Sequence, residues 1–95
     1  MIESFFIVID GEPQTITGKI ITKVGDPARQ MTYAFIKGND GGNYVRRRGK
    51  CSCCEEIQED YLKFDSWEEL KEYTDDSWIF EAVFNSMCGP AGGIH

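Results

Sequence analysis

The sequence predicts one α+β domain over residues 1–95, in which a four-stranded antiparallel sheet is followed by two C-terminal helices packed on one face. Three observations support this prediction. β-Branched and aromatic residues dominate the first half of the chain, glycine- and asparagine-rich turns separate these runs, and the apolar spacing becomes helical after the cysteines. A chain of 95 residues with 41% apolar and 27% charged residues is long enough for one modest core.

The strands are predicted from short apolar runs that end at turn-forming residues. The first run ends at Asp10-Gly11, a pair that favours a tight hairpin turn. Gly18 lies inside the second run and suggests a bulge or a close backbone approach. The last run contains consecutive arginines, which predict an edge strand because charge opposes further pairing. The four predicted strands cover residues 5–10, 15–24, 31–37 and 44–48.

Two helices are predicted in the second half. Asp65 or Ser66 should cap the first helix, and Ser66 and Glu69 have the spacing of a capping box. Apolar residues recur with helical spacing over 78–87, from Trp78 onward, and Gly89-Pro90 should end that run. The same run is rich in residues that favour strands, so a strand over 78–87 is the alternative.

Charge is divided sharply along the chain. Residues 1–50 carry eight basic and five acidic side chains, whereas residues 51–95 carry two and eleven. We expect the carboxylates of the second half to gather on one helical face, which would dock on a basic surface of a larger protein. The residues predicted to form this acidic face are Glu55, Glu56, Glu59, Asp60, Glu68, Glu69, Glu72, Asp75 and Asp76.

This charge pattern predicts a small, noncatalytic interaction protein, such as an inhibitor or an adaptor. Spaced carboxylates on a rigid helix can imitate a phosphate backbone, so the partner surface could be one that otherwise binds nucleic acid. The net charge of −6 disfavours direct binding of the chain to nucleic acid. The alternative interpretation of the acidic face is that it only maintains solubility.

The one basic run consists of Arg46, Arg47, Arg48 and Lys50. Arginine forks match phosphate and carboxylate groups, so a second hypothesis is a binder of small phosphorylated ligands or nucleotides. The alternative is a solvated edge strand that the acidic helix of the same protein partly neutralises.

The cysteines suggest a third hypothesis, a zinc-stabilised module. Cys51 and Cys54 have the two-residue spacing with which a tight turn presents two thiolates to one metal ion. Cys88 and His95, or Cys53, would have to complete the ligand set, because the sequence has no second pair with this spacing. No other cofactor is indicated. The alternative is that these cysteines are small buried or incidental surface residues, or that Cys88 forms a disulfide with the cluster.

Catalysis and membrane insertion are not expected. The chain has one histidine, the terminal His95, so no imidazole on a rigid element is available to activate a nucleophile. No segment approaches the roughly 18 apolar residues that span a bilayer. The first residues lack the basic start of a secretory signal. These features predict a cytoplasmic protein.

Overall fold

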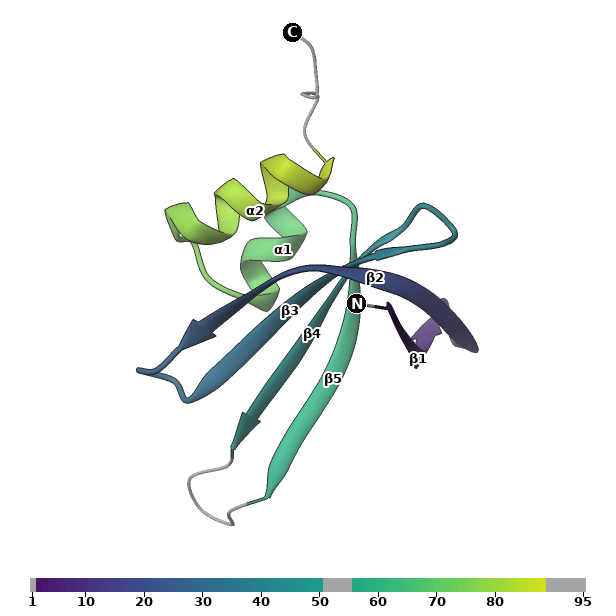
Figure 1. Ribbon diagram of the computed structural model, residues 1–95, viewed down its shortest axis with the longest axis horizontal. Helices are drawn as coiled ribbons and strands as arrows, with labels where there is room; N and C mark the ends of the chain where they lie inside the picture. Colours follow the sequence, from purple (N-terminus) through teal and green to yellow (C-terminus); the bar gives the residue numbers. More distant parts are fainter. Residues whose placement is uncertain (1, 51–55, 89–95) are drawn as a thin grey trace, which may run out of the picture.

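The fold is given by a computed structural model, which describes residues 2–50 and 56–88. Over these residues the α+β class is confirmed, but the sheet has five strands, so the prediction of four is wrong. The strands form an antiparallel meander in the order β1-β2-β3-β4-β5, and two helices follow (Figure 1). The elements are β1 (Ile2–Ile9), β2 (Glu12–Asp26), β3 (Met31–Gly38), β4 (Asn43–Lys50), β5 (Ile57–Phe64), α1 (Trp67–Tyr73) and α2 (Trp78–Cys88).

The strand missing from the prediction is β5. Its first four residues are exposed and, apart from Ile57, polar, and acidic residues have low strand propensity. Its pairing with β4 places Asp60 opposite Arg47 and Glu59 opposite Arg48, so opposite charges meet across the ladder. Because β5 covers its outer side, β4 is an interior strand, and the prediction of an edge strand there is also wrong.

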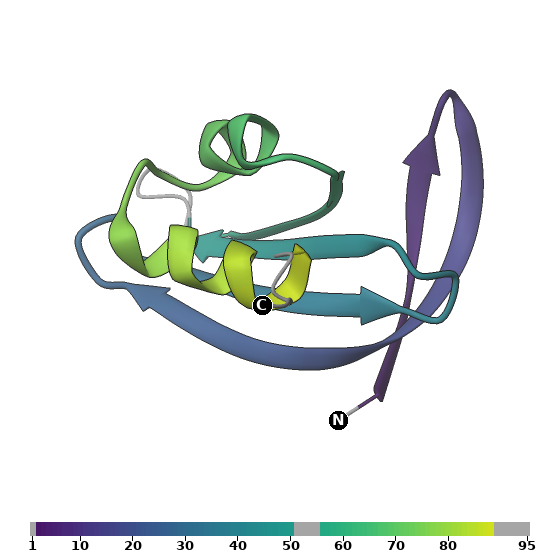
Figure 2. The same cartoon turned by 90° about the horizontal axis from the view of Figure 1, so that it is seen from above.

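The long strand β2 turns the sheet back over itself. Its first part pairs with β1 and its last part with β3, and the register shifts between Ile20 and Thr22. At Gly18 the two ladders meet, and a Cβ atom there would lie 2.6 Å from the carbonyl oxygen of Lys37. This position therefore requires glycine, as the close approach predicted from the sequence suggested. Figure 2 shows β1 crossing the direction of β3 and β4.

One core lies between the helices and the sheet. It consists of Tyr33, Phe35, Val45, Phe64, Leu70 and Phe80. Phe80 is the buried residue of α2, and its ring meets that of Tyr33 edge to face at 5.0 Å. The helices thus cover one face of the sheet, as predicted.

A second core lies on the other face, under the folded arm of β1 and the first part of β2. It consists of Phe5, Ile7, Ile16, Ile36 and Tyr44. Because both faces of β3 are covered, residues 33–36 are all buried. The N-terminal arm is therefore an integral layer of the fold.

The two helices begin as the sequence predicts. The Ser66 side chain accepts a hydrogen bond from the backbone N–H of Glu69, and Glu69 in turn accepts one from the N–H of Asp65. The run after Trp78 is a helix and not a strand. None of the helices in the described ranges is long and apolar enough to cross a membrane.

Candidate interaction surface

The basic run predicted from the sequence is engaged within the protein. Arg46 is buried and its guanidinium donates to the carboxylate of Glu3 on β1, while the Tyr61 hydroxyl contacts the same carboxylate at 3.4 Å. Burial alone would lower the pKa of Arg46, but its hydrogen bond with Tyr61 and the charge of Glu3 raise it overall. This group closes the N-terminal arm onto the sheet.

Arg47 joins the sheet to α1. Its Nε and Nη2 atoms donate to both oxygens of Asp60 at 2.9 and 2.6 Å, and its Nη1 donates to the Tyr73 carbonyl at 3.1 Å. The hydrogen bonds to Asp60 raise the pKa of Arg47, so it stays charged. Arg29 donates in the same manner to the Thr74 carbonyl at 2.9 Å. Both arginines therefore bind carbonyl groups at the C-terminal end of α1, where cations are favoured.

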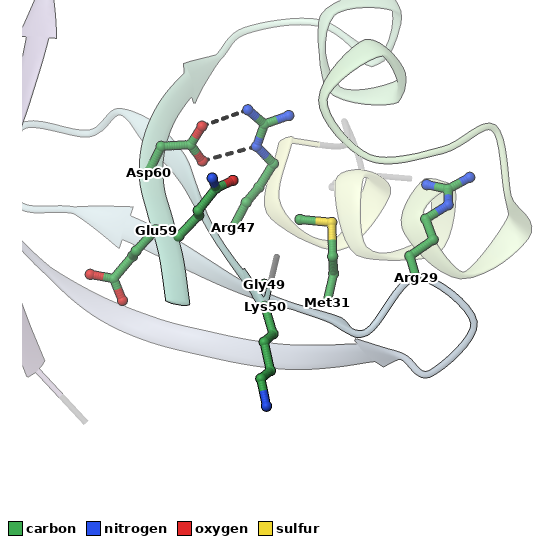
Figure 3. A pocket seen from close by; sticks show the side chains of 8 residues that line it. Arg29, Met31, Arg47, Gly49, Lys50, Glu59 and Asp60 are labelled. Carbon is green, nitrogen blue, oxygen red and sulfur yellow. Dashed lines mark hydrogen bonds and ion pairs between the residues drawn. The ribbon is translucent and has the colours of Figure 1, made fainter. Parts of the chain in front are cut away.

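These two arginines border a pocket of about 350 Å³ at the end of the sheet (Figure 3). Met31, Gly49, Lys50, Gln58 and Glu59 line it as well. Arg29 contacts the carboxylates of Asp26 and Asp75 in addition to its helix contact. A phosphorylated ligand would have to compete with these internal carboxylates for either guanidinium, which weakens the nucleotide-binder hypothesis.

The predicted acidic face is divided between two parts of the fold. Glu59 and Asp60 lie on β5 and pair with Arg48 and Arg47, so they are not on a helix and their charge is balanced. Glu56 is exposed just before β5, and Asp75 pairs with Arg29. Glu55 lies outside the described residues.

A smaller set of carboxylates remains on the helical layer. Glu68 and Glu72 are exposed on α1, four residues apart and so on one face of the helix. Neither forms an ion pair with any residue in 2–50 or 56–88, and the same is true of exposed Asp76 and Glu81. The carboxylate of Glu69 serves the helix cap instead. The acidic surface available to a partner is therefore centred on α1 and the start of α2.

Trp78 is the functional candidate that sequence reasoning missed. Helical spacing grouped it with the other apolar residues of this run, but Trp78 is 76% exposed and Phe80 is the buried residue of α2. Glu81 lies one turn further along the helix, and Asp76 lies two residues before Trp78. Tryptophan is enriched among the residues that dominate binding energy at interfaces, which makes this exposed ring a candidate anchor. The hydrophobic period indicates a helix but leaves its rotation open when most of its residues are apolar.

The negative charge on α1 also affects a neighbouring tyrosine. Burial raises the pKa of Tyr73, and the carboxylates of Glu69 and Glu72 raise it further. The charge of Arg47 acts in the opposite direction on the same pKa.

The zinc hypothesis falls largely outside the described residues, since Cys51, Cys53, Cys54 and His95 all lie there. Cys88 is half-buried at the end of α2, and burial raises the pKa of its thiol. Its neighbours Ser86 and Met87 line a pocket with Lys37.

The position of Cys88 bears on the proposed ligand set. Lys37, which lies near the end of α2, pairs with Asn43 at the start of β4. The cysteine cluster follows Lys50, which is the last residue of β4. Seven residue steps along β4 separate Asn43 from Lys50, about 23 Å at the usual strand rise. The metal site stays a prediction. Metal analysis of protein purified without chelator, with a C88S variant beside it, tests whether Cys88 takes part.

Within 2–50 and 56–88, no three histidine, cysteine or acidic side chains gather closely enough to hold a metal ion. Comparison with family models, curated proteins and solved structures finds no match to this chain. A function can therefore be proposed only from the chemistry of the protein's surface.

Proposed function

We propose that this protein is a noncatalytic interaction protein that docks on a basic surface of a larger protein through its helical layer. Glu68, Glu72 and Glu81 supply the negative charge and Trp78 supplies an apolar anchor. The observation that carries the proposal is the pairing of a 76% exposed tryptophan with neighbouring carboxylates on the same layer. An inhibitor or an adaptor would use such a surface.

The internal use of the arginines supports this proposal. Arg46, Arg47 and Arg48 each bind a carboxylate on β1 or β5, so the sheet contributes little net charge at these positions. The helical layer keeps its negative charge. A like-charge pair four residues apart, such as Glu68 and Glu72, costs an isolated helix roughly 0.2–0.5 kcal/mol. A cationic partner would relieve this repulsion.

The anchor supports the proposal in a different way. Tryptophan is enriched among residues that dominate binding energy, and a ring of this size can bury roughly 150–250 Å². Charges around such an anchor speed association and discriminate between partners, and their effect falls as salt rises. A dock of this kind should therefore depend on both the ring and the ionic strength.

The test is capture of lysate proteins at low and moderate salt by the full chain and three variants. E68Q/E72Q removes two charges from α1, W78S removes the anchor at constant charge, and E12Q/E56Q removes two exposed charges elsewhere. We expect the first two variants to lose basic proteins that the wild type retains at low salt, by about tenfold in affinity. The third should retain them.

Two results would contradict the proposal. Equal loss in E68Q/E72Q and E12Q/E56Q would mean that net charge alone drives binding. Capture that barely changes between the two salt concentrations would mean that charge does not lead the contact. Mass spectrometry identifies the captured proteins and shows whether they are basic.

A further inference from the structure

The two edge strands of the sheet face one another across a groove. β1 and β5 each have a single hydrogen-bonded neighbour within the described ranges, although Phe5 and Tyr61 stack between them at 4.2 Å. One part of the groove, about 370 Å³, runs between Phe6–Val8 and Glu59–Tyr61. A second part continues from Ile7 along Tyr61–Lys63 toward α1. Both walls are strand edges, whose backbone groups can pair with an added strand.

One end of this groove is apolar. Phe6 and Val8 are 78% and 68% exposed, and Pro13 of β2 lies beside them. The outward positions of β1 are Ile2, Ser4, Phe6 and Val8, none of which carries a charge. Natural edge strands are usually protected by charged or proline residues, so an unprotected apolar edge is typical of a place where another chain binds.

The other end of the groove is acidic. Asp10, Asp65 and Glu69 line it together with one cation, Lys63, and with Tyr73. The carboxylates of Glu59 and Asp60, nearer the apolar end, are already paired with arginines. The unbalanced charge is therefore at the end next to α1. A segment that fits both ends must be apolar along one half and basic along the other.

We propose that this groove binds an extended segment of a partner protein, added beside the β1 or β5 edge, with apolar residues against Phe6 and Val8 and basic residues near Asp10, Asp65 and Glu69. Charge complementarity selects this occupant. A second copy of β1 has no basic residue to offer, since its one charged residue is Glu3. The groove uses neither Trp78 nor Glu68 nor Glu72, so this proposal does not depend on the function proposed above.

The experiment uses the full chain and a labelled probe as long as β1 (8 residues). The probe is Lys-Lys-Thr-Val-Thr-Val-Thr-Val, and its two matched controls replace the lysines by glutamates or two valines by prolines. Fluorescence anisotropy measures binding, and amide hydrogen exchange locates it. We expect the lysine probe to bind and to slow exchange in β1 or β5. Each control should bind about tenfold more weakly, the first through charge and the second through lost backbone pairing.

Matched variants separate the groove from net charge. F6K/V8K places two charges on the apolar wall formed by β1, whereas I2K/I57K places one charge on β1 and one on β5 at exposed positions outside the groove. The first should weaken probe binding about tenfold and the second should leave it within about twofold. Thermal unfolding confirms that both variants fold.

Several outcomes would overturn the proposal. Equal weakening by both variants would reduce binding to nonspecific charge, and equal binding of the glutamate probe would remove the charge argument. Absence of probe binding would show that the groove does not accept this chemistry. A concentration-dependent dimer that F6K/V8K abolishes, without probe binding, would identify a second copy of the chain as the occupant.

Discussion

Replacing Glu3 by leucine should lower the free energy of unfolding more than breaking any of the protein's more exposed ion pairs. Arg46 is 9% exposed, and in the pair its side chain and that of Glu3 are 11% and 25% exposed. Removing one member of a buried pair typically costs 3–5 kcal/mol, because the other charge stays buried without compensation. Since Glu3 reaches solvent in part, we expect about 2 kcal/mol.

Urea unfolding followed by circular dichroism measures this loss. A cost of about 2 kcal/mol corresponds to a shift of about 1 M in the urea midpoint and of about 8–16 °C in the melting temperature for a domain of this size. Combining E3L with R46M should recover most of the loss, because an apolar pair of similar volume removes the buried charge.

The matched comparison is Glu59→Leu, which breaks the exposed pair with Arg48. The two side chains of that pair are 32% and 53% exposed, so we expect less than about 1 kcal/mol. Equal losses in E3L and E59L would refute the view that Arg46 is an internal clamp. So would a double variant whose loss equals the sum of the single losses, since that would mean that the two residues do not interact.

Three further predictions concern the core, pH and the sheet bend. Phe80→Ala should cost about 3–5 kcal/mol in a chemical unfolding series, whereas Trp78→Ala should stay within about 0.5 kcal/mol; similar losses would mean that the assigned faces of α2 are wrong. Asp40 accepts hydrogen bonds from a backbone N–H and a tyrosine hydroxyl, which lower its pKa below 3.8. The Asp40 carboxylate therefore stabilises the fold above pH 3.8, and this stabilisation is lost as pH falls through the lowered pKa. The difference in unfolding free energy between wild type and D40N should shrink toward pH 2. A difference that grows there would mean that the pKa of Asp40 is raised by folding, not lowered. Gly18→Ala should lower the free energy of unfolding by more than about 1 kcal/mol, because the added Cβ atom would lie 2.6 Å from the Lys37 carbonyl oxygen. Gly25→Ala should be nearly neutral in the same unfolding series, because no atom lies within 4 Å of the Cβ atom that it adds. Equal effects would show that the bend tolerates a side chain.

Local signals in the sequence located most of the elements. Asp10-Gly11 adopts the positive φ angles of a hairpin turn, 53° and 80°, and Ser66 caps α1. Both features depend on residues close together in the chain, so they can be read without knowledge of the fold. The same holds for the helix that begins at Trp78.

The missed strand had a different kind of signal. β5 is stabilised by its neighbour, since Arg47 and Arg48 find Asp60 and Glu59 directly across the ladder. The arginines before the cysteine cluster and the carboxylates after it could have indicated this pairing. Propensity alone could not, because it evaluates each residue without its cross-strand partner.

The candidate site was predicted only in its composition. An acidic surface on the helical layer is present in Glu68 and Glu72, but Glu59 and Asp60 belong to the sheet. The groove between the edge strands could not be predicted, because Phe6 and Asp65 are distant in the sequence and their positions depend on the bend in β2.

The sequence by itself determined the α+β class, the turns, the helix starts and the excess of negative charge in the second half. These properties depend on near neighbours or on composition, which folding does not change. The tertiary structure decided which charges are neutralised, which aromatic ring of α2 is exposed and which strands lie at the two ends of the sheet order in the described ranges. Those outcomes depend on contacts between residues far apart in the chain, and these contacts form only when β1 folds over the sheet.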